Sequence, residues 1–228
     1  MKNIQLMFLF CLFIVCGCNQ KEPQTSDKTV RISTETPASL AQISKKNILF
    51  FGNSLTAAYG LDDVAKGFVS LTQERIDSLN LAYHCINAGL SGETTAGGNS
   101  RIDWVIDQQP VDVFMLELGG NDALRGLPPA ESEKNLQSII DKVKKKYPSV
   151  KIVLAGMEAP RNMGGKYISD FHNIYANLAK RNKVTLIPFI LENVGGIASL
   201  NQKDGIHPTP EGNKIIVETI WATLKPLL

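Results

Sequence analysis

Short apolar runs alternate along this chain with longer stretches in which apolar residues recur at every third or fourth position. Continuous apolar runs of about four to eight residues are typical of strands that are buried on both faces of a sheet. Strands that alternate with helices in this way predict a parallel sheet with helices on both sides. The runs cover residues 48–51, 83–86, 111–118, 152–155 and 184–187.

Three of the longer stretches place their apolar side chains on one face of a helix. The first stretch stops before Pro148, and the last has Thr209 as N-cap and Pro210 at the first helical position. We interpret the three stripes as faces that pack on the core. Their members are Leu136, Ile139, Ile140 and Val143; Tyr167, Phe171, Ile174, Tyr175 and Leu178; and Ile215, Ile216, Thr219 and Ile220.

The first residues of the chain have a different composition. After Lys2, residues 4–17 are almost wholly apolar, which is short for a membrane-spanning helix of roughly 20 residues and suits a secretory signal. The end of this stretch, Val15-Cys16-Gly17-Cys18, is similar to a bacterial lipobox, in which Cys18 is lipidated. We therefore predict a lipoprotein signal peptide over residues 1–17. The alternatives are an ordinary signal peptide cleaved elsewhere and an uncleaved membrane anchor.

Residues 18–46 are polar and lack the apolar surface that would offset the entropy cost of ordering them. We predict that they form a flexible tether with an average reach of about 30 Å. The tether would join the lipid at Cys18 to a single domain over residues 47–228. This places the protein outside the cytoplasm, held to a membrane on the periplasmic side or at the cell surface.

Composition excludes several other classes of function. The formal net charge of +2 is too small to indicate a nucleic-acid partner. No Cys/His cluster has the spacing of a zinc site. Removal of the signal and lipidation of Cys18 would leave Cys85 alone, so we expect no internal disulfide and interpret Cys85 as a core residue. Nothing in the sequence implies a protein partner.

Four short motifs carry chemically useful side chains, and three of them directly follow apolar runs. Because ligands of parallel sheets bind beyond the carboxyl ends of the strands, we expect the motifs to meet at one edge. The motifs are Gly52-Asn53-Ser54-Leu55-Thr56, Asn87-Ala88-Gly89, Gly119-Gly120-Asn121-Asp122 and Asp204-Gly205-Ile206-His207-Pro208.

The motifs contain the components of a nucleophilic site. A serine hydroxyl such as that of Ser54 needs a base, and an imidazole is suited to that task near neutral pH. His207 follows Asp204 by three residues, and a carboxylate of this kind fixes the tautomer of an imidazole. We expect the rate to decline below about pH 6 as the base is protonated. His84 and His172 lack such neighbours, and we interpret both as structural.

With these motifs the chain resembles the SGNH (GDSL-type) serine hydrolases, in particular the arylesterase and thioesterase I/lysophospholipase branch. The resemblance implies a three-layer α/β/α, flavodoxin-like sandwich with a five-stranded parallel sheet. It also implies that Ser54 is the nucleophile, His207 the general base and acid, and Asp204 its orienting carboxylate. The implied oxyanion hole consists of the Ser54 N–H, the Gly89 N–H and the Asn121 side chain. No metal or organic cofactor is expected.

One position departs from the pattern of the family. The first motif usually reads Gly-Asp-Ser-Leu, whereas this chain has Asn53. Asparagine keeps the shape of aspartate and one acceptor, loses the charge and gains a donor. Glu117 lies in an apolar run, where an unpartnered charge would be costly to bury. We therefore predict a hydrogen bond from Asn53 to Glu117.

The expected reaction is hydrolysis of a carboxylic ester through an acyl-Ser54 intermediate. Short-chain and aryl esters are the first candidates, followed by lysophospholipids and thioesters. We predict that the acyl site is walled by loops 124–129 and 157–165, through Leu124, Leu127, Met157 and Pro160.

Two other functions remain open from the sequence. A carbohydrate O-deacetylase of the same fold is one alternative. It is disfavoured by an aromatic content of 7% and by the helical positions of Trp104 and Trp221, because sugar grooves usually present stacking aromatics. The alternative of a different class is a non-catalytic surface lipoprotein that serves as a binding module.

Overall fold

The computed structural model describes residues 45–228. The predicted signal peptide, the lipidation site at Cys18 and nearly all of the predicted tether lie outside the described residues. Within residues 45–228, no helix combines the length and apolar character needed to cross a membrane.

A five-stranded sheet forms the centre of the fold, with strand order β2-β1-β3-β4-β5. Every neighbouring pair is parallel. All five apolar runs are confirmed as strands, although the third and fifth strands are shorter than their runs. The strands are β1 (Lys46–Gly52), β2 (Tyr83–Gly89), β3 (Val113–Glu117), β4 (Lys151–Ala155) and β5 (Thr185–Ile187).

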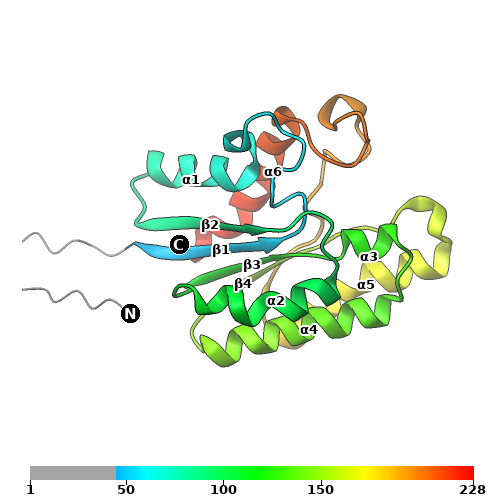
Figure 1. The fold of residues 1–228 in the computed structure, drawn as a ribbon, viewed down its shortest axis with the longest axis horizontal. Coiled ribbons are helices and arrows are strands. Elements are labelled where there is room, and N and C mark those ends of the chain that lie inside the picture. Colours follow the sequence, from blue (N-terminus) through cyan, green and yellow to red (C-terminus); the bar gives the residue numbers. More distant parts are fainter. Residues whose placement is uncertain (1–44) are drawn as a thin grey trace, which may run out of the picture. The chain divides into compact units, whose positions relative to one another are not determined.

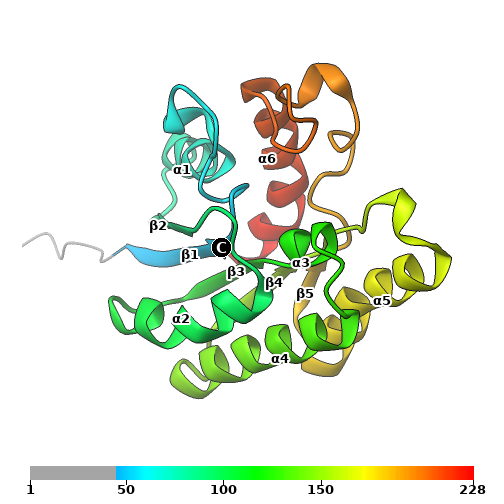
Figure 2. The same ribbon diagram turned by 45° about the vertical axis from the view of Figure 1, so that its right-hand side comes forward.

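Helices cover both faces of the sheet, as Figures 1 and 2 show. Helices α1 (Phe68–Ser78) and α6 (Pro210–Leu224) pack together on one face. Helices α2 (Thr95–Asp107), α4 (Pro129–Lys146) and α5 (Gly165–Asn182) cover the other. The predicted three-layer, flavodoxin-like architecture is therefore confirmed. The shorter elements are α3 (Gly120–Leu124) and the 3₁₀ turns Val64–Lys66, Arg161–Met163, Ala198–Leu200 and Lys225–Leu227.

The predicted apolar stripes lie on the inner faces of their helices, and most of their members are buried. Every member of the α4 stripe is fully buried, and each such side chain contributes roughly 1.5–3 kcal/mol relative to an exposed one. In α6 the buried face runs through Ile216, Val217 and Ile220, whereas the predicted members Ile215 and Thr219 are half-buried. Thr209 caps α6 as predicted, since its hydroxyl accepts from the Gly212 N–H at 3.2 Å.

The topology brings the sequence motifs to one edge of the sheet. Strands β1, β2 and β3 are adjacent and parallel, so they end side by side at Gly52, Gly89 and Glu117. Each motif that follows one of these strands therefore begins at the same edge. The short helix α3 lies at this edge as well (Figure 2).

Candidate active site

The turn that carries Ser54 begins where β1 ends. Gly52 is confined there, because a Cβ atom at this position would lie 2.1 Å from Thr56 Oγ1 and 2.6 Å from Glu117 Oε2. Beyond it the chain coils tightly: the Ala57 N–H donates to the Asn53 carbonyl, and the Tyr59 N–H donates to the Ser54 carbonyl, both at 3.0 Å. Ser54 thus sits at the start of a compact turn at the sheet edge.

Ser54, His207 and Asp204 form a continuous chain of hydrogen bonds. Ser54 Oγ lies 2.8 Å from His207 Nε2, and His207 Nδ1 lies 2.6 Å from Asp204 Oδ2. The second oxygen of Asp204 accepts from the backbone N–H groups of Ile206 at 2.9 Å and of His207 at 3.0 Å. The three predicted residues are therefore brought together, with the imidazole between the hydroxyl and the carboxylate.

The hydrogen bonds around Asp204 favour the ionised form of its carboxyl group. The hydrogen bond from the His207 side chain, helped by the two backbone N–H groups, lowers the pKa of Asp204 to about 2. An ionised Asp204 accepts the Nδ1 hydrogen, which leaves Nε2 free to accept a proton from Ser54. The geometry therefore suits proton transfer from the hydroxyl to the imidazole.

Gln202 and Tyr59 support the imidazole, although neither belongs to one of the four sequence motifs. The Gln202 N–H donates to the His207 carbonyl at 2.7 Å. Its side-chain amide donates to the carbonyls of Tyr59 at 2.9 Å and Pro208 at 3.1 Å. The Tyr59 ring packs against the imidazole at a centroid distance of 4.8 Å. Gln202 thereby joins the loop of His207 to the turn that follows Ser54.

The predicted contact between Asn53 and Glu117 is confirmed. Asn53 Nδ2 donates to Glu117 Oε1 at 2.7 Å, and the Asn53 N–H donates to Oε2 at 3.2 Å. The Thr56 hydroxyl also donates to Oε2, at 2.9 Å. Burial raises the pKa of Glu117 to about 7, although these hydrogen bonds oppose the rise. On its other side, Asn53 Oδ1 accepts from the Leu55 N–H at 3.0 Å, so Glu117 and the Ser54 turn are joined through Asn53.

The structure argues against Gly89 as an oxyanion donor. The Gly89 N–H already donates to Asn87 Oδ1 at 2.9 Å, in a turn closed by the asparagine side chain. By contrast, the backbone N–H groups of Ser54 and Gly92 have no hydrogen-bond acceptor within residues 45–228. The prediction for Gly89 therefore requires correction, and Gly92, in the turn that follows, has an N–H without an acceptor among residues 45–228.

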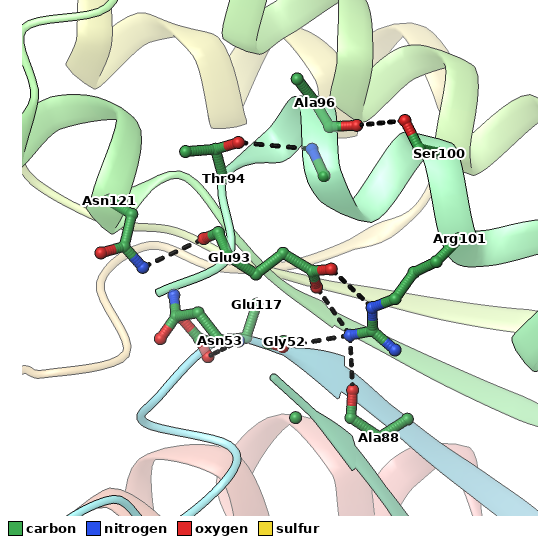
Figure 3. A network of polar contacts seen from close by, with 12 residues as sticks. Gly52, Asn53, Ala88, Glu93, Thr94, Ala96, Ser100, Arg101, Glu117 and Asn121 are labelled. Carbon is green, nitrogen blue, oxygen red and sulfur yellow. Dashed lines mark hydrogen bonds and ion pairs between the residues drawn. The ribbon is translucent and has the colours of Figure 1, made fainter. Parts of the chain in front are cut away.

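Asn121 lies beside the turn that contains Gly92. Its Nδ2 atom donates to the Glu93 carbonyl at 3.0 Å, which leaves the second hydrogen of the amide available (Figure 3). Asp122, the next residue, is buried and accepts from the Thr95 N–H and hydroxyl and from the Ser132 hydroxyl. Asp122 thus anchors α3 to α2 and α4 and holds Asn121 in place.

Comparison with known proteins identifies the family. The GDSL-like Lipase/Acylhydrolase family matches residues 50–215. Esterase TesA of Pseudomonas aeruginosa is 39% identical over 187 residues, which is 82% of this chain and 92% of TesA. Thioesterase 1/protease 1/lysophospholipase L1 of Escherichia coli K12 is 33% identical over 79% of this chain and 84% of its own length. The crystal structure of AlinE4, an SGNH-hydrolase family esterase, has 40% sequence identity and a TM-score of 0.67, covering 81% of this chain and 97% of AlinE4.

This chain belongs to the GDSL-like lipase/acylhydrolase family. The resemblance inferred from the four motifs is therefore confirmed. Asn53 occupies the second position of the Gly-Asp-Ser-Leu motif after which the family is named, so this chain has asparagine where the motif has aspartate.

The two loops predicted to wall the acyl site lie against each other in this family member. The Tyr167 hydroxyl donates to the Leu127 carbonyl at 2.8 Å, and Met163 Cε lies 3.3 Å from the point where a Cβ atom on Gly126 would be. Of the predicted lining residues, Leu124 is 50% exposed and Met157 is buried. Leu127 and Pro160 are half-buried.

No metal site accompanies these residues in the described part of the chain. Within residues 45–228, no group of three or more His, Cys, Asp and Glu side chains is placed to hold a metal ion. His84 and His172 are exposed on β2 and α5. The groups that meet at the sheet edge are the Ser54 hydroxyl, the His207 imidazole and the Asp204 carboxylate.

Proposed function

We propose that this chain is a serine esterase that hydrolyses carboxylic esters through an acyl-Ser54 intermediate. The observation that carries the proposal is the hydrogen-bonded chain from Ser54 through His207 to Asp204, with distances of 2.8 and 2.6 Å. The names of its relatives, an esterase and a thioesterase, support the same reaction class.

In the first half of the reaction, Ser54 Oγ attacks the ester carbonyl as His207 Nε2 takes the hydroxyl proton. The imidazolium that forms is stabilised by the ionised Asp204 and then gives its proton to the departing alcohol. In the second half, His207 takes a proton from water, the resulting hydroxide attacks the acyl-Ser54 ester, and Ser54 regains its proton. Each proton passes through Nε2, since Nδ1 stays bonded to Asp204.

The negative charge of the tetrahedral intermediate needs donors that are already aimed at it. We assign this role to the Ser54 N–H, the Gly92 N–H and the second Nδ2 hydrogen of Asn121, none of which has an acceptor within residues 45–228. Gly92 replaces the predicted Gly89, whose N–H is taken by Asn87. Loss of one such donor typically lowers the rate by about 10²–10³.

The acyl group would lie between loops 124–129 and 157–165. Leu124 offers exposed apolar surface, while Leu127, Met157 and Pro160 shape the wall behind it. Short or single acyl chains suit these surfaces, and thioesters are chemically accessible to the same nucleophile.

The test is release of p-nitrophenol from a short-chain p-nitrophenyl ester by the wild type and by Ser54→Ala and Asn121→Ala. We expect Ser54→Ala to be inactive and Asn121→Ala to keep its KM while losing most of kcat. Full activity in Ser54→Ala would refute the nucleophile. A wild type that is inactive across acetyl to long-chain esters and thioesters would favour the non-catalytic binding module.

The proposed cellular location of the enzyme rests on the sequence of residues 1–46 alone. A lipid on Cys18 and the polar residues 18–46 would hold the domain near a membrane outside the cytoplasm. Mass spectrometry of the full chain from membrane fractions tests this directly. We expect a lipid-modified Cys18 at the new N-terminus and release of Cys18→Ala from the membrane.

A further inference from the structure

An ion pair between Arg101 and Glu93 lies behind the turn that carries Gly92. Arg101 Nε donates to Glu93 Oε1 at 2.5 Å, and Nη2 donates to Oε2 at 2.6 Å, so the pair is bidentate. The same Nη2 atom donates to the Ala88 carbonyl at 2.8 Å and lies 3.4 Å from the Gly52 carbonyl (Figure 3). One side chain of α2 therefore binds the carboxyl ends of both β1 and β2.

The pair is well shielded from water. The side chain of Glu93 is only 3% exposed and that of Arg101 is 22% exposed. The guanidinium also packs over the Phe51 ring, 4.2 Å from its centroid. Burial of a charged pair carries a large desolvation cost, so such pairs are weak evidence for stability as such. Stability alone therefore does not account for this pair.

Glu93 connects this pair to the oxyanion donors by its backbone. Its carbonyl accepts from Asn121 Nδ2 at 3.0 Å, and its N–H donates to the Leu90 carbonyl at 3.1 Å, which closes the turn around Gly92. An amide Nδ2 has two hydrogens in one plane, so fixing one of them fixes the direction of the other. A shift of the Glu93 carbonyl would rotate the amide and misdirect the hydrogen left for the substrate.

We propose that Arg101 and Glu93 are positioning residues that set the geometry of the oxyanion hole. The bidentate bond fixes Glu93 against the ends of β1 and β2, and the Glu93 carbonyl in turn fixes the Asn121 amide. Neither side chain touches the substrate. The inference rests on the proposed function, because it assigns a purpose to donors that matter only if an oxyanion forms.

The chain contains a second arginine–glutamate pair, more exposed than the first, that serves as a control away from the site. Arg75 on α1 and Glu218 on α6 form a second two-point pair, with Nη1 at 2.9 Å from Oε2, and Arg75 lies over the Trp221 ring at 5.5 Å. This pair has the same chemistry but has no contact with the Ser54, Gly92 or Asn121 segments. Its loss therefore reports the effect of removing an arginine–glutamate pair without disturbing the site.

The experiment measures kcat, KM and thermal unfolding of the full chain with p-nitrophenyl butyrate. The variants are Arg101→Met, Glu93→Gln, Asn121→Ala, the double variant Arg101→Met/Asn121→Ala and the control Arg75→Met. We expect Arg101→Met to lower kcat by about 10- to 100-fold, short of the full loss of a donor, with KM changed less than about threefold. Glu93→Gln keeps the shape of the side chain and one acceptor, so kcat should fall less in this variant than in Arg101→Met. Arg75→Met should keep kcat within about twofold.

The double variant separates positioning from general destabilisation. If Arg101 acts through Asn121, its removal should lower kcat of Asn121→Ala by less than about threefold, because the group it positions is already gone. Multiplicative losses would overturn the inference, as would an Arg101→Met enzyme that loses stability and keeps kcat. Should Arg101→Met fail to fold, Glu93→Gln and its combination with Asn121→Ala give the same comparison. An inactive wild type or an active Ser54→Ala would instead refute the proposed function itself.

Discussion

The contact between Asn53 and Glu117 makes Asn53→Asp an informative substitution, because it restores the residue usual at this position of the GDSL motif. Asn53 Nδ2 lies 2.7 Å from Glu117 Oε1, and the two residues are only 3% and 1% exposed. Aspartate would place a carboxylate oxygen where the amide donor now stands. Two carboxylates would then face each other with no donor between them.

The size of the effect follows from this distance. At an effective dielectric constant of about 20, two unit charges 2.7 Å apart repel each other by about 6 kcal/mol. The pair would avoid this cost by retaining one shared proton, as coupled carboxyls do. Holding that proton above the apparent pKa of the pair costs about 1.4 kcal/mol per pH unit. The variant should therefore become less stable than the wild type as the solution becomes alkaline.

The sign of the pH dependence follows from proton uptake. Burial raises the pKa of Glu117 to about 7, so between about pH 4.5 and 7 the folded wild type binds more protons than the unfolded chain, and its free energy of unfolding falls as pH rises. In the wild type this fall ends near pH 7. In Asn53→Asp the second carboxyl extends this fall in the free energy of unfolding to higher pH. The stability of the variant relative to the wild type should therefore decrease by about 2–3 kcal/mol between pH 7 and 9.

Urea unfolding followed by circular dichroism from pH 5 to 9 measures this deficit. Asn53→Ala is the control without a new charge. Loss of the amide donor raises the pKa of Glu117 somewhat further, so the stability deficit of this variant should grow above pH 7, but by less than that of Asn53→Asp. The double variant Asn53→Asp/Glu117→Gln exchanges amide and carboxylate and should abolish the growth above pH 7. A constant deficit in Asn53→Asp over this range, or its persistence in the double variant, would refute the reasoning.

Three further outcomes are expected. Asp204→Asn should lower kcat by about 10²–10⁴, because an amide cannot enforce the tautomer of His207, and steady-state kinetics at pH 7.5 should detect no compensating fall in KM. Burial raises the pKa of Cys85 to about 12, so its alkylation by iodoacetamide at pH 8 should be about a thousandfold slower in the folded than in the unfolded chain, measured by peptide mass spectrometry. Leu124→Ser and Leu127→Ser should each lower the octanoate-to-acetate ratio of kcat/KM several-fold, because each removes apolar surface from the proposed acyl wall; unchanged ratios would place the acyl chain elsewhere.

The fold could be predicted because its signals are local. Each strand contains a short, mainly apolar run, and in β3 that run reflects burial along the whole strand. The hydrogen bond between Asn53 and Glu117 could be predicted for a related reason. A carboxylate in such a strand must find a donor, and Asn53 at the end of the neighbouring strand could supply one.

The error at Gly89 arose from orientation, which sequence conveys poorly. A glycine after a strand can direct its N–H outward or toward a nearby side chain, and both give the same residue pattern. Asn87 precedes Gly89 by two residues, the spacing at which an asparagine side chain accepts from the backbone. That spacing could have indicated that the Gly89 N–H is occupied. Gly92, with a φ of +80°, belongs to a turn whose N–H directions depend on the tertiary fold.

Arg101, Gln202 and Tyr59 could not be predicted from the chain, since each acts on residues distant in sequence. Arg101 falls on a helix where a solvated arginine would look the same. Its purpose is visible only once β1 and β2 are adjacent and their terminal carbonyls converge on one guanidinium. Gln202 similarly acquires a role only when the loop of His207 reaches the turn after Ser54.

Three buried carboxylates surround the candidate site. The desolvation cost of burying them indicates that they are present for a reason other than stability. Glu93, Glu117 and Asp122 are each at most 6% exposed, and within residues 45–228 no buried side-chain nitrogen or oxygen lacks a partner. Apolar side chains of similar volume often stabilise a protein as well as such charges do. The carboxylates instead bind donors from the Ser54 turn, from Arg101 and from α2 and α4, which apolar groups could not orient. Directional hydrogen bonding, rather than burial energy, is therefore the property that this edge of the sheet requires.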